Sequence, residues 1–192
     1  MAKFSILSII LISISLIGFN CKSDKEEAKV EQIPAHGEAK IAGDLTYTVP
    51  DGWVKQQPSS RMRKAQFRLP GHGKAADAEL ALFVFPGSGG SVQANIDRWV
   101  DQFIQPDGSN SAEKTEIKEI ESNGLPVTLV YLTGTHLKGT MGGPSAKLPG
   151  YAMLAAIVQT STDPWFFKAV GPQETIDYWR PAFESFAKTI KK

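Results

Sequence analysis

Length, composition and charge set the first limits on this protein. The chain has 192 residues, of which 42% are hydrophobic and 9% aromatic, which suffices for the core of one domain. Lys and Arg total 21 against 20 acidic residues, and Lys3 is the only charged residue before Cys21, so the chain from Cys21 onward is neutral. A neutral chain argues against nucleic acid as a partner, because proteins that bind it carry a basic excess.

The N-terminus has the pattern of an export signal. Lys3 is followed by an apolar stretch, rich in Ile and Leu, that runs from Phe4 to Phe19. This stretch is shorter than the ~20 residues that a helix needs to cross the hydrocarbon core of a membrane. The pattern therefore predicts a signal peptide at residues 1–20 and not a permanent transmembrane helix.

Cys21, the only cysteine, directly follows this stretch. Leu16-Ile17-Gly18-Phe19-Asn20-Cys21 resembles a relaxed lipobox, the cleavage site of bacterial lipoproteins. The resemblance implies that Cys21 carries the lipid, with palmitate among its acyl chains, and that the protein is anchored to a membrane of the cell envelope on its extracytoplasmic side. Lys22 after the cysteine resembles lipoproteins that are sent to an outer membrane where one exists.

The segment after the anchor is charged and poor in large apolar residues. Residues 22–43 contain nine charged residues, four lysines and five acids. A segment of this composition cannot bury enough apolar surface to fold. We therefore expect residues 21–43 to be a lipidated cysteine with a disordered tether, and residues 44–192 to form a single globular domain, which we expect to be a monomer.

The globular segment consists mostly of β-rich runs separated by turn residues. Asn123-Gly124 between two such runs is a strong hairpin signal, and Pro50-Asp51-Gly52 marks another turn. The predicted strands are 45–49, 53–54, 61–69, 78–85, 115–121, 125–133, 151–160 and 165–170.

Two segments have the spacing of amphipathic helices. The first begins after Ser91 as N-cap and places Val92, Ile96, Trp99, Val100 and Phe103 on one face. The second follows Gly171-Pro172 and places an apolar stripe on one face as well. The stripe of the second helix comprises Ile176, Trp179, Phe183, Phe186, Ala187 and Ile190.

Three of the predicted strands are apolar on both faces, namely those at residues 80–85, 153–158 and 165–170. Such strands need cover on both sides. The pattern predicts an α+β fold in which an antiparallel β-sheet carries one helix on each face, a three-layer α/β/α sandwich. A two-layer sheet with both helices on one face is the alternative.

The domain also resembles a known family. Tyr47-Thr48-Val49-Pro50-Asp51-Gly52-Trp53 at its start and Phe183-Glu184-Ser185-Phe186 in its last helix are similar to the PsbP-like family, which includes small bacterial lipoproteins of the DcrB type. The resemblance covers most of residues 45–192. It implies a PsbP-like fold and a binding or scaffold role, because members of that family act chiefly by binding other proteins.

The sequence contains no recognised catalytic or cofactor motif. His36, His72 and His136 have no paired spacing, so we expect no metal site. The Gly108–Ala112 segment approximates a nucleophile elbow but does not follow a strand, and the Gly134–Thr140 segment has Thr where a phosphate loop has Lys. We therefore expect no catalytic residue and no cofactor.

Charged residues within apolar strand patterns are the better candidates for a binding site. Arg63 alternates in phase with Ala65 and Phe67, and Lys168 with Phe166 and Val170, so both belong on covered faces and need partners. If they met near the glycine-rich turn at residues 86–91, they would mark an anion-binding cleft; otherwise each pairs structurally or reaches a sheet edge.

Two further segments are candidate binding surfaces. Ser91, Asn95, Arg98 and Gln102 form a polar stripe beside the apolar face of the first helix, which a solvated helix face also explains. The segment His136–Pro149 is long for a loop and is predicted to be a recognition surface.

Three functions are compatible with these features. The first is a membrane-anchored module that binds or scaffolds an envelope protein. The second is a carrier of a small molecule or anion, and the third is a hydrolase without a recognised motif. The candidate binding residues are Arg63, Asn95, Arg98 and Lys168.

Overall fold

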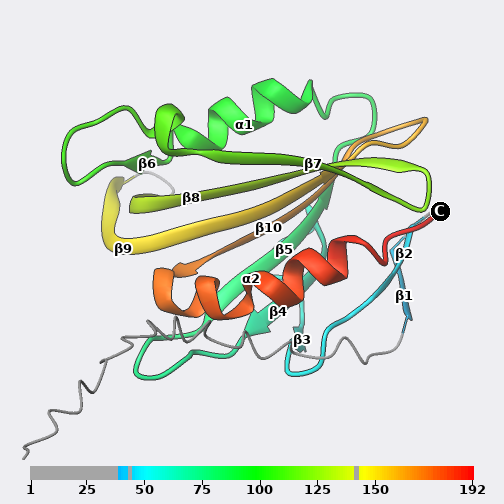
Figure 1. Ribbon diagram of the computed structural model, residues 1–192, viewed down its shortest axis with the longest axis horizontal. Coiled ribbons are helices and arrows are strands. Elements are labelled where there is room, and N and C mark those ends of the chain that lie inside the picture. The colour runs from blue at the N-terminus through cyan, green and yellow to red at the C-terminus, as the bar shows by residue number, and fades with distance from the viewer. Residues whose placement is uncertain (1–38, 43–44, 141–142) are drawn as a thin grey trace, which may run out of the picture. The chain divides into compact units, whose positions relative to one another are not determined.

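The computed structural model describes residues 39–192, apart from residues 43–44 and 141–142 (Figure 1). The predicted export signal, Cys21 and most of the predicted tether lie outside the described residues. All described residues belong to one compact unit.

The elements follow one another mostly as strands. The strands are β1 (Ala39–Ala42), β2 (Leu45–Thr48), β3 (Val54–Gln56), β4 (Arg63–Leu69), β5 (Ala78–Val84), β6 (Phe103–Ile104), β7 (Glu116–Ser122), β8 (Leu125–Thr140), β9 (Gly143–Val158) and β10 (Trp165–Pro172). The helices are α1 (Val92–Val100), α2 (Gln173–Ala187) and the short 3-10 helix η1 (Ser111–Lys114).

Eight of these strands form one antiparallel sheet. Its order is β3-β4-β5-β10-β9-β8-β6, and β7 also pairs with β8. The pair β1 and β2 forms a separate two-stranded sheet with Ala39 opposite Thr48. β1 lies within residues 21–43, the segment predicted to hold the lipidated cysteine and the tether, and pairing with β2 supplies hydrogen bonds to its backbone.

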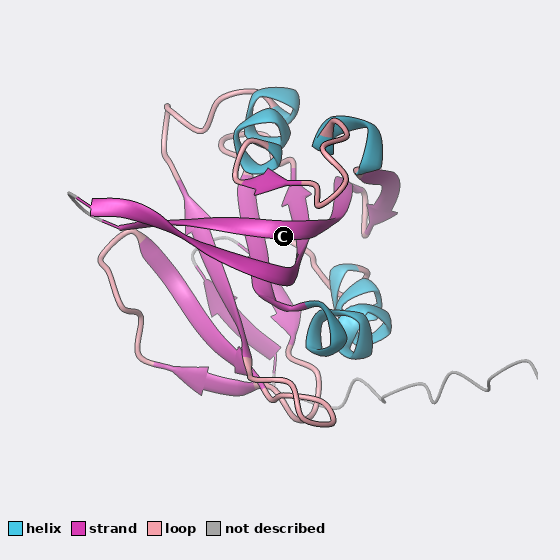
Figure 2. Ribbon diagram, turned by 90° about the vertical axis from the view of Figure 1, so that its left-hand side faces the viewer, coloured by secondary structure: helices cyan, strands magenta, loops and turns pink. Residues whose placement is uncertain are grey.

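The sheet carries one helix on each face, as the alternation of apolar residues predicted. On one face, Ile176, Trp179 and Phe183 of α2 belong to a core with Leu82 and Phe167 of the sheet. On the other face, Ile96, Trp99 and Val100 of α1 pack with a second set of sheet residues. That set includes Val130, Leu132, Met153, Ala155, Ile157 and Phe166. Figures 1 and 2 show the strands between the two helices, so the three-layer α+β arrangement is confirmed.

The core on the α2 face is an aromatic cluster. The ring of Phe186 lies 5.2 Å from those of Trp53 and Phe167 and 5.4 Å from that of Tyr47. Each of these side chains is at most 8% exposed. Residues 47–53 and 183–186 are far apart in the sequence, but their aromatic side chains pack together in this core.

Local signals in the sequence mark several ends of elements correctly. The Ser91 side chain accepts a hydrogen bond from the backbone N–H of Ala94 at 3.1 Å and caps α1. Asn123 and Gly124 have φ values of 50° and 81°, as a two-residue hairpin turn between β7 and β8 requires.

Two predicted elements are wrong. α1 ends at Val100, and Phe103 lies in β6 opposite His136 instead of in the helix. Phe103 still packs in the core on the α1 face, so its burial was predicted correctly, whereas its helical backbone conformation was not. The segment His136–Pro149 is not a loop, because β8 and β9 continue through it as a long hairpin with His136 opposite Leu148.

Candidate functional site

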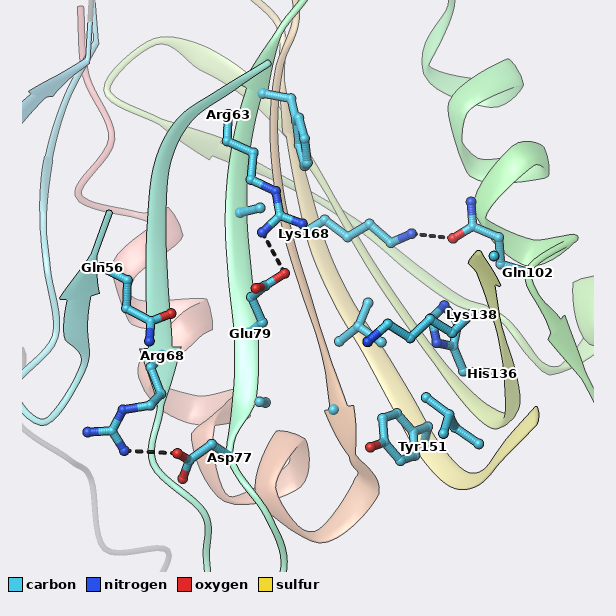
Figure 3. A pocket seen from close by; sticks show the side chains of 17 residues that line it. Gln56, Arg63, Arg68, Asp77, Glu79, Gln102, His136, Lys138, Tyr151 and Lys168 are labelled. Atoms are coloured by element: carbon cyan, nitrogen blue, oxygen red, sulfur yellow. Dashed lines mark hydrogen bonds and ion pairs between the residues drawn. The ribbon is translucent and has the colours of Figure 1, made fainter. Parts of the chain in front are cut away.

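A half-open cleft lies on the face of the sheet that α1 covers. Its volume is about 590 Å³, and the sheet forms its floor (Figure 3). One wall consists of side chains from β4 and β5, including Arg63 and Glu79. The other wall consists of Gln102 after α1 and of the β8–β9 hairpin, including His136 and Tyr151.

Small residues flank Lys168 on the floor of the cleft and leave space above the sheet. In the register of the sheet, Lys168 of β10 lies opposite Ala81 of β5 on one side and Ala155 of β9 on the other. Large apolar side chains at these positions would fill the space above the sheet. Lys168 is therefore the one long side chain in this row of three, and it rises between two methyl groups.

The cations on the β4–β5 wall are neutralised. The Arg63 guanidinium lies 2.6 Å from a carboxylate oxygen of Glu79, and Gln66 donates to the other oxygen of Glu79 at 2.8 Å. Arg68 pairs with Asp77 at 3.0 Å. Each charge on this wall thus has a partner of opposite sign, which favours the structural interpretation of Arg63.

Lys168 has no such partner. Its Nζ donates to Oε1 of Gln102 at 2.6 Å and lies 5.5 Å from the centre of the Trp99 ring. Among the residues that the structure describes, no carboxylate lies within ion-pair distance of it. Burial, followed by the nearby charge of Arg98, lowers the pKa of Lys168 to about 8.

His136 lines the cleft as a neutral side chain. Its ring lies 5.0 Å from that of Phe103 and is stacked on Tyr151 at 6.3 Å, and no hydrogen-bond partner of its buried Nδ1 is found in the described part of the chain. Burial, and then the charges of Lys168 and Lys138, lower the pKa of His136 to about 4. Both lysines are therefore close to His136, and the imidazole carries no charge near pH 7.

The cleft as a whole has a positive excess. Four cations line it, Arg63, Arg68, Lys138 and Lys168, and two acids, Asp77 and Glu79, so the difference is +2. The acids lie on the β4–β5 wall with their arginine partners. The excess therefore belongs to the side of the cleft that Lys168 and Lys138 form.

The predicted binding residues have different positions. Arg63 and Lys168 line the same cleft, although the glycine-rich turn at residues 86–91 does not. Asn95 is 2% exposed, and its amide donates to the carbonyls of Gly89 and Ser91 at 2.7 and 2.8 Å, so it stabilises that turn. The interpretation of its stripe as a solvated face is therefore wrong at Asn95.

Arg98 connects that turn to the cleft. It is exposed, donates to Oδ1 of Asn95, and its charge acts on Lys168. Arg98 therefore adds to the positive potential near Lys168 without lining the cleft itself.

The sequence did not single out Lys138 or Tyr151, and it placed His136 in a loop. A signal was present, since His136 and Lys138 keep the phase of Val130 and Leu132, which lie on the α1 face. The glycines and the two prolines of residues 134–149 concealed it, because such residues are typical of loops. Gln102 was placed on a helix face and instead reaches Lys168 from the connection between α1 and β6.

The described residues offer binding groups more readily than catalytic ones. No Ser–His hydrogen bond occurs among them, and the imidazole of His72 is stacked on Tyr178 at 4.1 Å. In the same part of the chain, no three His, Cys, Asp or Glu side chains gather as metal ligands would. What the cleft presents is one mostly buried cation, amide groups and aromatic surface.

No described helix is long and apolar enough to cross a membrane.

Comparison with known proteins gives likeness of fold only. No family model matches the sequence, and no curated protein matches it significantly. Among solved structures, the chain is similar to a protein of unknown function from Pseudomonas aeruginosa, with 14% identity, a TM-score of 0.45 and coverage of 82% of this chain and 97% of the other. It is also similar to the cyanobacterial PsbP of Synechocystis sp. PCC 6803, with 12% identity, a TM-score of 0.46 and coverage of 83% and 98%.

A third similar structure comes from Bacteroides thetaiotaomicron, with 12% identity and a TM-score of 0.44. The match covers 81% of this chain and 48% of the other, so this chain spans about half the length of that protein. Likenesses this distant describe the fold and assign no function to the chain.

Proposed function

We propose that this chain is a lipoprotein, anchored to a membrane of the cell envelope through Cys21, whose extracytoplasmic domain binds a ligand in the cleft over Lys168. The observation that carries the proposal is the contrast within the cleft: Arg63 and Arg68 have acidic partners, whereas among the described residues the hydrogen-bond partner of Lys168 is an amide. A mostly buried cation without a counter-charge is unfavourable for the folded state, and a ligand can supply the missing partner.

The volume of the cleft supports a small ligand. Ligand sites commonly occupy ~300 to 1,000 Å³ and combine apolar surface with a few polar groups. The cleft has a volume of about 590 Å³, with Phe83, Leu148 and Tyr151 as apolar lining and Lys168 as a polar group. The small-molecule carrier is therefore favoured over the hydrolase, for which no Ser–His pair is found in the described residues.

A substitution that fills the cleft tests this function. Val170 lines the cleft, is partly buried and lies two residues after Lys168 on the same face of β10, so Val170→Trp should place an indole in the cleft. A panel of small anions, sugars, amino acids and bases is screened by thermal shift against the full chain. At least one class should stabilise the wild type and lose its effect in Val170→Trp.

The matched control is Ala94→Trp, which adds the same side chain at an exposed position of α1 outside the cleft. This variant should keep the thermal shift. If no compound stabilises the wild type, or if Val170→Trp responds as the wild type does, the cleft is not the binding site.

Anchoring is tested separately. Cys21→Ala should move the protein from the membrane fraction to the soluble fraction, because the lipid would be its only stable attachment. Labelled palmitate should enter the wild type and not the variant. A wild type that takes up no label would contradict the anchor.

A protein partner is a second candidate, favoured by the edge that β7 forms. Within the described chain β7 pairs only with β8, and Ile117 on it is 49% exposed, so its outer edge is open to a strand from an envelope protein. Crosslinking in intact cells should capture such a partner in the wild type and lose it in Ile117→Lys, while Val54→Lys on β3 serves as the control at another exposed position.

A further inference from the structure

We propose that the ligand of the cleft is a small organic anion whose carboxylate or phosphate is bound by Lys168 and Lys138, while its apolar part lies against Tyr151 and Leu148. This inference rests on the proposed function, since it names the chemical class that the cleft would bind.

The first support is the position of the charge. Lys168 stands between Ala81 and Ala155, so no neighbouring side chain on the floor separates its Nζ from the space above the sheet. Gln102 accepts one of its hydrogen bonds, and an ammonium group has two more to donate. An anionic oxygen in the cleft would accept from the same group and neutralise it.

The second support is the distribution of charge between the walls. Glu79 and Asp77 each already bind an arginine, so they are occupied on the far wall. Lys138 and Lys168 line the cleft together with His136, away from the ion pairs of the β4–β5 wall (Figure 3). Two cations on one side favour a ligand with a localised negative charge over a neutral or cationic one.

The third support is the lining beside these cations. The Tyr151 ring belongs to the hairpin wall next to His136 (Figure 3). Leu148 lies opposite His136 in the same hairpin, and Val170 lines the cleft from β10. This surface suits an apolar group attached to the acidic one. A ligand with both parts would use the cations for orientation and the hairpin for contact area.

The experiment measures binding to the full chain in non-ionic detergent by titration calorimetry. The probes are benzoate and phenyl phosphate, with benzamide as the neutral counterpart of benzoate. Benzoate and phenyl phosphate should bind saturably, and benzamide should bind at least tenfold more weakly. Dihexanoylphosphatidylglycerol, a short-chain lipid, serves as a separate arm: Lys168-dependent binding of this lipid, in place of the soluble probes, would identify a lipid headgroup as the source of the anion.

Three variants assign the effect to the cleft. Lys168→Met keeps the apolar stem and should weaken benzoate binding at least tenfold, and Lys138→Met should weaken it several-fold. Lys118→Met removes a lysine that pairs with Glu184 of α2 and should leave the affinity unchanged. Melting curves of all three variants show whether each is folded.

The wild type alone supplies a test that does not depend on any variant. The titratable and charged groups around Lys168 are Arg98 from α1, His136 and Lys138 from β8, and the pair of Arg63 and Glu79 from β4 and β5. His136 is already neutral between pH 7 and 9. Because neutral Lys168 no longer attracts the anion, benzoate affinity should fall about tenfold from pH 7 to pH 9, the factor by which the protonated fraction falls for a pKa of about 8.

Failure of this inference can be told apart from failure of the proposed function. If benzamide or another neutral compound binds and Val170→Trp abolishes that binding, the cleft is a ligand site and the anion assignment is wrong. The assignment is also wrong if benzoate binds equally to wild type and Lys168→Met, or with the same affinity at pH 7 and pH 9.

Discussion

The two faces of the sheet differ in how completely they are closed. On the α2 face, aromatic side chains from β2, β10 and α2 fill the space, and the cation above them, Arg180, binds Glu116 and Glu184 at 2.6 and 3.3 Å. On the α1 face, which carries the shorter helix, a cleft lies above Ala81 and Lys168, and Lys168 has an amide as its partner. The difference separates a face built for stability from one that keeps an unsatisfied group for a ligand.

The two cations respond to their surroundings in opposite directions. Burial alone would lower the pKa of Arg180, but hydrogen bonds and charges from Glu116 and Glu184 outweigh it and raise that pKa. Burial and the charge of Arg98 lower the pKa of Lys168, and no acid among the described residues compensates. The protein therefore stabilises the charge of Arg180 and disfavours that of Lys168.

The largest expected difference between the faces lies in their aromatic residues. Phe186→Ala should lower the free energy of unfolding by about 4 kcal/mol, because it leaves a cavity among Tyr47, Trp53 and Phe167. Phe83→Ala, at a partly buried position that lines the cleft, should lower it by only about 1 to 2 kcal/mol. Urea unfolding of both variants measures the difference, and equal losses would mean that the two faces are equally closed.

The two cations should give effects of opposite sign. Lys168→Met should raise the free energy of unfolding by about 1 to 2 kcal/mol, because it removes a buried charge that lacks a partner. Arg180→Met should lower it by about 1 kcal/mol, because Glu116 and Glu184 lose a shared partner at a partly exposed position. A loss of stability in both variants would show that Lys168 stabilises the fold as Arg180 does.

A smaller effect follows from His136 and its pH dependence. Its pKa is about 4 in the folded state and 6.5 without the surroundings, so the unfolded chain binds more protons between these values. Stability should therefore rise as pH increases from 4 to 6.5, with about 1 kcal/mol of the rise due to His136 after solvent screening. His136→Phe keeps the ring contacts and should remove this part of the rise. Urea unfolding at pH 4.5 and 7 measures it, and identical pH profiles would contradict it.

The smallest expected effect concerns the ends of the two helices. Ser91 caps α1 through its side chain, and α2 has no side-chain cap at Pro172. Ser91→Ala should lower the free energy of unfolding by about 0.5 to 1 kcal/mol. Thermal unfolding should show this loss, whereas Thr189→Ala, after the end of α2, would remove hydrogen bonds to Thr48 and Phe186 and report on the other helix.

The sequence predicted the layers of the fold more completely than its edges. Alternating apolar residues such as Phe166 and Phe167 indicated cover on both faces, because a strand presents successive side chains to opposite sides. Phe103 and the hairpin beyond Thr133 were missed for a related reason. The spacing of Phe103 from Ile96 and Trp99 fits a helix. Its backbone instead pairs with His136, which is 33 residues away in the sequence.

The site was predictable only in part. Arg63 and Lys168 stood out because a charge interrupts an apolar pattern, and both line the cleft. The sequence could not predict that Arg63 has an acidic partner and Lys168 an amide. The register of β4 against β5 brings Glu79 to Arg63, and the end of α1 brings Gln102 to Lys168. Sequence shows that a buried charge needs a partner, and only the fold shows which partner it has.

The most direct test of the account compares unfolding with and without ligand. Urea unfolding is followed for wild type and Lys168→Met, each alone and with saturating benzoate. Without benzoate, Lys168→Met should be the more stable protein. When benzoate is added, only the wild type should gain stability, because a ligand that binds the folded state alone stabilises that state. A less stable Lys168→Met that gains as much from benzoate as the wild type would contradict the account.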